Sequence, residues 1–599
     1  MRRVWWFSLL LVIATTYACG TSSDLRQEVT EYLSDYEKTF QELYYEASLA
    51  QWETNTHIVE GDTTNAARQQ RAKEALAAFV GSVENIERLK GYLENRDRLT
   101  SLQVRQLEVM LYRAADQPGI IPDVVSERIA AETEQVEALF GFEFRLNGEP
   151  ITPNQIDELL RTSNDLEERR AVWEASKEVG PELKSGLVKL RDLRNETVRA
   201  LDYPDFFTYQ VSDYGMTTPE MLELMDELVY ELRPLYRELH TWVRYELASR
   251  YDEPVPELIP AHWLPDRWAQ RWNDLLSVEG LDPDPALDEQ SVEWIVKRGE
   301  EFYVSLGFEK LSENFYELSS LYPLPEDADY KKNTHASAWH LDLDQDVRSL
   351  MSVDTNRRWW GTSLHELGHI YYFMSYTRPE VPLLLREGAN RGFHEGIGNL
   401  IRLVSLQRQF LVNRGLVPVD AEVDPILQLL QEALRYVVVI QFGAGTMTRY
   451  EYALYVEELS PDQLNAKWWE LVRRYQGVAP PSPRGEEYAD GLTKTHINND
   501  PGQYYDYPIS YALVFQLHDH IAKEILGQDP HDTDYWGSIE TGDFLREIME
   551  PGMTRPWQEL LEDTTGRQLS AQAMVDYFQP LYEWLVEQNQ GRTHTLPDL

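Results

Sequence analysis

The sequence predicts a mainly α-helical protein with few short strands. Apolar residues recur at spacings of three or four along most of the 599 residues, and alternating patterns typical of strands are rare. The length alone would accommodate about four domains. Because no Gly/Ser-rich or Pro-rich linker and no change of composition follows residue 25, we expect one large body with two subdomains around a cleft. No repeat of 20–50 residues is evident, which argues against a solenoid.

The helical periodicity is clearest in a series of long segments. It predicts helices over residues 25–52, 66–93, 101–116, 221–251, 290–306, 425–440 and 511–526, with a kink at Pro234 in the fourth of them. The best candidates for strands are residues 142–146 and 338–343. Most of the abundant Trp and Tyr side chains are expected to fill the core between these helices.

The N-terminus has the pattern of an export signal. Arg2 and Arg3 precede an apolar run over residues 4–13 that is too short to cross a bilayer. Residues 16–20, TYACG, then look like a bacterial lipoprotein cleavage site. We therefore expect residues 1–18 to be a removed signal peptide and Cys19 to be the first mature residue, carrying lipid.

An ordinary secretory signal is the alternative, because Thr16 stands where Leu is usual. Under either interpretation the chain is exported, and no disulfide can form within it because Cys19 is the only cysteine. Gly20 after the cysteine favours retention at the outer membrane. The expected location is the bacterial cell envelope, in the periplasm and anchored to the outer membrane by lipid.

The charge of the chain disfavours nucleic acid as a partner. Its 56 Lys and Arg stand against 101 Asp and Glu, a formal net charge of −45, whereas nucleic-acid binding depends on neutralising phosphates. A solvated acidic surface is the simpler explanation. Steering of a substrate by the acidic surface is the alternative.

Residues 365–369 read HELGH, the HExxH pattern of zinc proteases. In a helix over residues 363–372, His365 and His369 lie one turn apart on one face and can hold one Zn²⁺. Glu366 lies beside them, where it can take a proton from water. The short motif alone is weak, since it can occur by chance on an amphipathic helix. Glu395, in a later helix-like segment, is the candidate third ligand, which leaves the fourth position open as a catalytic zinc requires.

Other segments carry polar groups suited to amide hydrolysis. His335 begins an extended segment that could bind a peptide backbone. Lys494 and His496 follow a Pro-rich loop, and Tyr504 and Tyr507 come soon after. A His and a Tyr here could stabilise an oxyanion. Taken singly, each residue fits a structural role as well.

Several motifs together resemble the angiotensin-converting-enzyme family of zinc peptidases. They are IPAHW at 259–263, WAQRW at 268–272, HASAW at 335–339, HELGH at 365–369, GANRGFHE at 388–395, YQG at 475–477, PP at 480–481, Arg484 and KTH at 494–496. Their order and spacing are close to those of the family from about residue 219 to 521. The first 200 or so residues match only in their helical character.

The resemblance implies a large, two-lobed, helical metallopeptidase with a deep central groove. It implies one peptidase domain over residues 24–595, with lid-like helices over about 24–120 and a catalytic core over about 220–525. It also implies release of C-terminal dipeptides from oligopeptides. By similarity, one zinc ion per chain is held by His365, His369 and Glu395.

The resemblance also assigns the remaining roles. Glu366 is the general base and then the acid for the leaving amine, and His496 and Tyr507 stabilise the oxyanion. His335 and the backbone of Ala336 align the substrate.

Gln270, Lys494 and Tyr504 match the pocket for the substrate's terminal carboxylate, since one buried cation and two neutral donors suit a carboxylate. The monocarboxypeptidase branch of the family has Arg in place of Gln270, so Gln270 favours release of dipeptides.

The chain departs from the family at several positions. Val472 and Asp506 stand where the family has the arginines of its chloride sites, which predicts that chloride is not required. Asn399 stands where an Asp typically orients a ligand His, which predicts weaker zinc binding or a shifted pH optimum. Val478 and Ser352 replace family cysteines.

Two alternatives remain at this point. One is a carboxypeptidase or oligopeptidase of the same fold. The other is a catalytically idle, peptide-binding surface lipoprotein, which the complete set of ligands and catalytic groups disfavours. A groove enclosed within one chain needs no partner subunit, so a monomer is expected.

Overall fold

The computed structural model describes residues 22–599 except residues 60, 62 and 326. The expected signal peptide and Cys19 lie outside these residues. The described chain is mainly α-helical with a few short strands, as the sequence predicts. Among the described helices, none is both long enough and apolar enough to cross a membrane.

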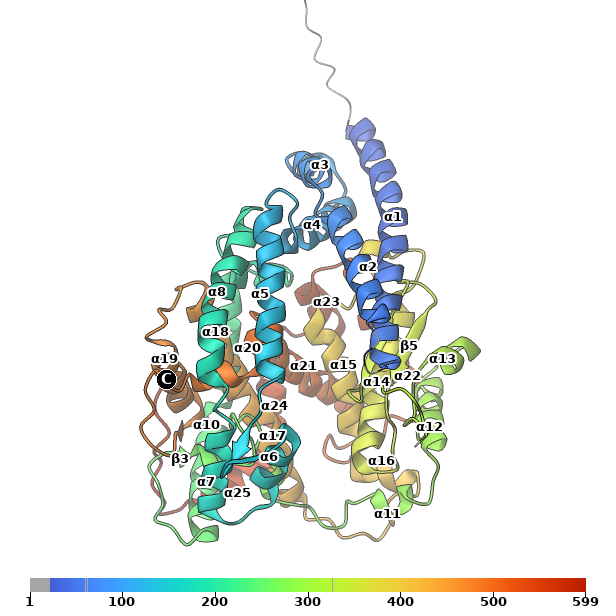
Figure 1. Ribbon diagram of the computed structural model, residues 1–599. Coiled ribbons are helices and arrows are strands. Elements are labelled where there is room, and N and C mark those ends of the chain that lie inside the picture. Colours follow the sequence, from blue (N-terminus) through green and yellow to red (C-terminus); the bar gives the residue numbers. More distant parts are fainter. Residues whose placement is uncertain (1–21, 60, 62, 326) are drawn as a thin grey trace, which may run out of the picture.

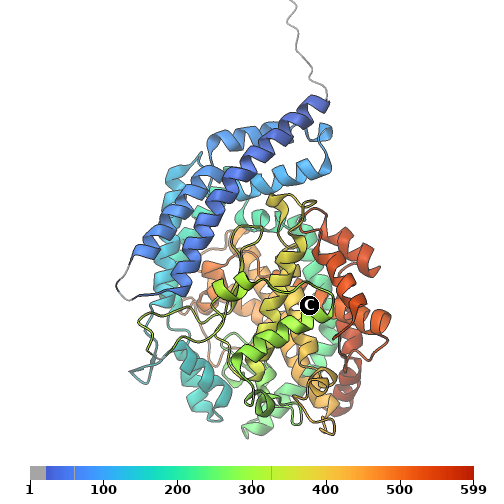
Figure 2. The same cartoon turned by 90° about the vertical axis from the view of Figure 1, so that its right-hand side faces the viewer.

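The N-terminal helices lie across one end of the molecule (Figure 1, blue). They are α1 (Ser22–Thr56), α2 (Thr64–Val80), α3 (Val83–Leu93), the short 3₁₀ segment η1 (Arg96–Arg98) and α4 (Ser101–Asp116). Figure 2 shows α1 and α2 reaching down one side of the body, away from the C-terminal helices in red. These helices occupy the part of the chain for which lid-like helices are predicted.

The single helix predicted over residues 66–93 is wrong, because two helices occupy this segment. α2 ends at Val80 and α3 begins at Val83. Ser82 is extended and caps α3 by accepting a hydrogen bond from the backbone N–H of Asn85 at 3.3 Å. A serine that caps a helix competes with continuing the preceding one, which explains the break.

Two groups of helices lie on either side of the centre in Figure 1. The chain first builds α5 (Pro122–Phe140), α6 (Pro153–Thr162), α7 (Leu166–Ala175), α8 (Gly180–Arg199), α9 (Phe206–Ser212) and α10 (Thr218–Arg250). α10 corresponds to the predicted helix over 221–251 and continues through Pro234. The next segments are η2 (Ala261–Trp263), η3 (Asn273–Leu275), α11 (Asp284–Leu287), α12 (Val292–Ser305) and α13 (Glu313–Leu318).

The C-terminal half contains the helices that carry the candidate metal ligands. They belong to the series α14 (Arg357–Tyr376), η4 (Leu383–Leu385), α15 (Arg391–Ser405), α16 (Arg408–Asn413), α17 (Pro425–Ile440), η5 (Gln441–Met447), α18 (Thr448–Tyr455), α19 (Leu464–Leu471) and η6 (Val472–Gln476). The chain ends with η7 (Asp490–Thr493), α20 (Thr495–Asn499), α21 (Asp506–His520), η8 (Ile521–Leu526), α22 (Ile539–Met549), α23 (Trp557–Thr565), α24 (Gln572–Tyr577) and α25 (Gln579–Gln588).

The described strands form three small pairs. β1 (Arg145–Leu146) and β2 (Glu149–Pro150) are antiparallel, β3 (Ile259–Pro260) and β6 (Val478–Ala479) are parallel, and β4 (Ser337–His340) and β5 (Val347–Leu350) are antiparallel. The strand predicted over 142–146 is therefore reduced to its last two residues. The strand predicted over 338–343 ends at His340, because the Asp342 carboxylate accepts backbone N–H groups of Asp344 at 2.8 Å and Asp346 at 2.9 Å and turns the chain into β5.

Candidate active site

Helix α14 places the two histidines of the HELGH motif on one face. Asn356 caps the helix by accepting a hydrogen bond from the backbone N–H of Trp359 at 3.0 Å. The rings of His365 and His369 have centroids 4.7 Å apart, and their Nε2 atoms lie 3.1 Å apart. Two nitrogens on one tetrahedral zinc would be separated by about 3.3 Å, so the pair has the geometry of two ligands to one ion.

Glu395 completes the candidate metal centre from α15. Its carboxylate lies 3.7 Å from His365 Nε2, and the ligand atoms of His365, His369 and Glu395 all lie within 4.8 Å of one another. Two imidazoles and one carboxylate are the donor set of a common class of catalytic zinc sites. The residues that are present therefore fit a zinc ion.

Close contact between α14 and α15 brings the ligands together. A Cβ atom built on Gly398 would lie 2.7 Å from His365 Nδ1, and one built on Gly368 would lie 3.1 Å from the Gly398 Cα. Only glycines permit the two helices to approach this closely. The prediction that Ser363–Tyr372 is helical, with Glu395 on a second helix, is confirmed by α14 and α15.

His394 is a third histidine beside the candidate metal ligands. Within the described residues, no hydrogen bond joins the Asn399 side chain to His365 or His369, although Asn399 is buried. The His394 Nδ1 atom lies 3.0 Å from His369 Nδ1. Burial lowers the pKa of His394 well below its usual value, so its neutral ring can accept a hydrogen bond and leave the His369 Nε2 lone pair free for a metal.

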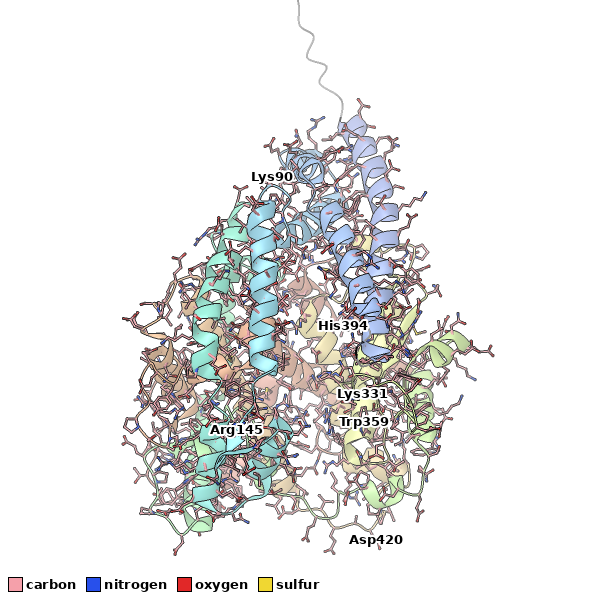
Figure 3. All side chains as sticks on the ribbon, viewed as in Figure 1. Lys90, Arg145, Lys331, Trp359, His394 and Asp420 are labelled. Carbon is pink, nitrogen blue, oxygen red and sulfur yellow. The ribbon has the colours of Figure 1, made fainter. Side chains whose placement is uncertain are left out.

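Sequence reasoning missed His394, although it directly precedes the third ligand. Figure 3 labels it in the central region of the molecule, whereas Lys90 and Asp420 lie at opposite ends.

Glu366 is buried beside the metal ligands, with 6% of its surface exposed. Burial, and then the charge of Glu395, raise the pKa of Glu366 to about 8. A divalent cation held by the three ligands would favour the ionised carboxylate. The Glu366 carboxylate is therefore more basic than an ordinary glutamate, which suits a general base.

The candidate metal centre opens on a cavity of about 930 Å³. Its lining includes Tyr44 and Lys73 from the N-terminal helices, so α1 and α2 form part of its wall. The volume suits a peptide of a few residues. Of the predicted site residues, those that line this cavity are His335, Ala336, His365, Glu366, His369, Glu395 and Tyr507.

His335 and Ala336 lie where the chain enters β4. His335 is exposed to the cavity, and its Nδ1 lies 2.8 Å from the Ala336 carbonyl oxygen. The edge of an extended segment offers backbone groups to a bound peptide. The position of both residues is consistent with a role in aligning substrate.

His496 and Tyr507 form a pair next to the cavity. His496 Nε2 lies 3.1 Å from the Tyr507 hydroxyl. Burial, and then the charge of Lys494, lower the pKa of His496 to about 3, and burial raises the pKa of Tyr507 above its usual value. Both groups are therefore neutral near pH 7 and can donate a hydrogen bond to a developing oxyanion.

The three residues of the predicted carboxylate pocket contact one another. Lys494 Nζ donates to Gln270 Oε1 at 2.6 Å, and the Tyr504 hydroxyl donates to the same oxygen at 3.3 Å. Lys494 has 3% of its surface exposed, and burial lowers its pKa to about 7. A carboxylate that replaced Gln270 Oε1 as the acceptor would meet the same two donors.

Asp506 is buried beside a cation. Its carboxylate lies 3.2 Å from Arg391 Nε and accepts a hydrogen bond from the Tyr214 hydroxyl at 2.5 Å. Arg391 also forms a bidentate pair with Asp500 at 3.0 and 2.8 Å. Two carboxylates therefore neutralise this arginine from within the chain.

The sequence matches a known family over nearly its whole length. The profile of the Peptidase M2 family, described as angiotensin-converting enzyme, matches residues 23–596. The angiotensin-converting enzyme of Mus musculus is 30% identical over 597 residues, which cover 94% of this chain and 44% of the relative. The enzyme of Rattus norvegicus is 33% identical over 463 residues, covering 74% of this chain and 34% of the relative, and that of Bos taurus is 34% identical over 423 residues, covering 67% and 32%.

The chain thus spans less than half the length of these curated relatives. The resemblance first indicated by HELGH, GANRGFHE and the other motifs is confirmed by the family match. The chain belongs to the angiotensin-converting-enzyme family of zinc-dependent peptidases.

Proposed function

We propose that this protein is an exported, zinc-dependent peptidyl-dipeptidase that removes dipeptides from the C-termini of oligopeptides. The observation that carries the proposal is the convergence of His365, His369 and Glu395 within 4.8 Å, at the wall of a peptide-sized cavity. Family membership supports the reaction class, and the Gln270–Lys494–Tyr504 pocket supports the C-terminal specificity.

The roles of the residues follow from their positions. When bound, zinc supplies a Lewis acid that polarises the peptide carbonyl and lowers the pKa of water. Glu366 takes the proton of the attacking water and passes it to the leaving amine nitrogen as the C–N bond breaks. His496 and Tyr507 donate hydrogen bonds to the carbonyl oxygen as it gains negative charge.

The carboxylate pocket sets where the chain is cut. A substrate with a free C-terminus places its carboxylate against Lys494 and Tyr504, which fixes its register along the cavity. Gln270 is shorter than an arginine and carries no charge, so it leaves room for two substrate residues between the carboxylate pocket and the carbonyl that is attacked. The fragment released from the C-terminus is then a dipeptide.

A matched pair of peptides tests this specificity. We expect a hexapeptide with a free C-terminus to lose its last two residues, and the same peptide with a C-terminal amide to react at least about 100-fold more slowly in kcat/KM, because the pocket then holds no anion. Product masses give the site of cleavage. Equal cleavage of both peptides would indicate an oligopeptidase, and loss of single residues would indicate a monocarboxypeptidase.

The buried lysine predicts a pH dependence. The cation of Lys494 is present below its pKa of about 7 and is lost as the pH rises through that value. The kcat/KM for free-carboxyl substrates, which reports the free enzyme, should therefore fall above about pH 7. The arginine of the Lys494→Arg variant keeps its charge throughout this range, so this variant should not show the fall in kcat/KM at alkaline pH. The control is Lys467→Arg, because Lys467 forms a surface ion pair with Glu470 at 3.2 Å; this variant should show the same fall as the parent. An unchanged profile in Lys494→Arg would exclude this lysine as the titrating group.

We also propose that activity does not require chloride. The charge of Arg391 is already neutralised by Asp500 and Asp506, so this position offers no unpaired cation that could bind a chloride ion. Replacing sodium chloride with sodium acetate at constant ionic strength should change kcat/KM by less than about twofold. A loss of tenfold or more without chloride would contradict the proposal.

Export and anchoring rest on the N-terminal sequence. We propose that Cys19 carries lipid at the outer membrane and that the mature protein is a monomer. Labelling of cells with a radioactive fatty acid should mark the protein, and Cys19→Ser should remove the label. An unlabelled parent would favour the ordinary secretory signal, and a labelled Cys19→Ser protein would contradict the assignment of the lipid to Cys19.

A further inference from the structure

A second cavity, of about 520 Å³, is rich in arginine. It lies between the segment that follows Trp272, the first turn of α14, the last turns of α15, and α17. The charged side chains of its lining are Asp284, Arg357, Arg358, Arg402, Glu432 and Arg435. Cations outnumber carboxylates here, although the whole chain carries a net charge of −45.

Two of these arginines, Arg402 and Arg435, have buried Nε atoms without a hydrogen-bond partner. In the part of the chain that the structure describes, neither Arg402 nor Arg435 donates a side-chain hydrogen bond or has a carboxylate within 4.0 Å, and the Nε atoms of both are buried without a partner. Burial, and then the charge of Arg435, lower the pKa of Arg402 to about 10, so Arg402 remains charged near pH 7. Adjacent cations without an anion are unfavourable and create a strong preference for one.

The acidic groups of the lining are engaged elsewhere. The Glu432 carboxylate accepts hydrogen bonds from the Tyr577 hydroxyl at 2.8 Å and from Gln428 Nε2 at 3.2 Å. Asp284 accepts the backbone N–H of Arg357 at the start of α14. The positive charge of Arg402 and Arg435 is therefore left facing the cavity.

The fold makes room for this arrangement. Gly361 lies inside α14, where glycine weakens a helix. A Cβ atom at this position would lie 3.3 Å from Arg402 Cγ and 3.4 Å from its Nε. The glycine therefore allows the Arg402 side chain to lie against the helix that carries His365.

A short path of contacts joins this cavity to the carboxylate pocket. Gln270 belongs to the pocket and Asn273 lines the cavity, so the segment between them connects the two. Between them, Arg271 Nη2 lies 3.5 Å from the Tyr511 hydroxyl. The Tyr511 ring lies 5.4 Å from that of Tyr436, which lines the cavity next to Arg435.

We propose that Arg402 and Arg435 bind an oxyanion, and that this oxyanion is the side-chain carboxylate of an aspartate or glutamate at the C-terminus of the substrate. The inference rests on the proposed function, because the neighbouring pocket must hold the α-carboxylate of that residue. Guanidinium groups match the fork of a carboxylate. The protein is thus selective for peptides that end in an acidic residue.

Two peptides that differ only in their last residue, Glu or Gln, test the inference. The wild-type protein should cleave the Glu peptide with a kcat/KM at least about tenfold higher, the ratio given by one charge-assisted hydrogen bond. The Arg402→Gln and Arg435→Gln variants should each bring this ratio towards one. Arg408→Gln removes the same charge on α16, where Arg408 lies 3.8 Å from Asp532, and should keep the wild-type ratio.

Equal cleavage of the two peptides by the wild-type protein would overturn the inference while leaving the proposed function intact. If the wild-type protein cleaves neither peptide, the proposed function is contradicted. The preference for an acidic C-terminal residue is then tested by a binding measurement. In calorimetry, Ala-Glu should bind the wild-type protein more tightly than Ala-Gln, and Arg435→Gln should remove the difference. Equal binding of both dipeptides, together with binding of inorganic phosphate that depends on Arg435, would show a site for free anions and overturn the substrate assignment.

Discussion

Replacing Glu366 with Gln is expected to lower kcat by about 1,000-fold or more, within the range of rate that a positioned general base supplies. Glutamine has the same shape but cannot accept the proton of the attacking water. Because the ligand atoms belong to His365, His369 and Glu395, the zinc content should stay at one ion per chain. Initial rates and metal analysis of the same preparation measure both quantities.

The matched control is Glu380→Gln. Glu380 is a largely exposed carboxylate that lies 3.8 Å from Arg378, outside the cavity lining. Its replacement should leave kcat within about twofold of the parent, as is usual for surface substitutions. A Glu366→Gln protein that contains zinc and keeps a tenth of the parental kcat would exclude Glu366 as the base.

Replacing Tyr507 with Phe is expected to lower kcat by about 100-fold, with little change in KM. The hydroxyl would stabilise charge that develops only in the transition state, and loss of one oxyanion donor typically costs 100- to 1,000-fold. Steady-state kinetics with a dipeptide-releasing substrate separate kcat from KM. The control is Tyr230→Phe, at an exposed tyrosine of α10, which should leave both kcat and KM unchanged.

The pairing of Tyr507 with His496 adds a second test. Because His496 Nε2 lies 3.1 Å from the Tyr507 hydroxyl, the two substitutions should not be additive. The double variant His496→Ala and Tyr507→Phe should lose less activity than the product of the single losses. An unchanged kcat in Tyr507→Phe, or strictly multiplicative losses, would mean that the two groups do not act as a unit.

Much of the fold was predictable because helix periodicity is local. The helices predicted over 101–116 and 425–440 have the same bounds as α4 and α17. The helix over 66–93 failed because one capping interaction, Ser82 with Asn85, outweighs a continuous apolar pattern. Strand ends were less predictable, since the turn after His340 depends on hydrogen bonds made by Asp342.

The candidate site also has parts that the sequence predicts and parts that only the structure shows. The spacing of His365 and His369 fixes their geometry once the segment is helical, so the sequence alone predicts a pair of ligands. Contacts between distant segments cannot be predicted from local spacing. Lys494 and Gln270 are 224 positions apart, and only the family resemblance placed them in one pocket before the structure was known. The contact between His394 and His369 depends on how α15 is rotated against α14, which the structure alone supplies.

Mass spectrometry of the products from a decapeptide with a free C-terminus tests the central claim most directly. The zinc-loaded protein should remove dipeptides one after another, a chelator should stop the reaction, and added zinc should restore it. Loss of single residues would contradict the role given to Gln270. Cleavage that continues after zinc has been removed would contradict the metal-dependent mechanism altogether.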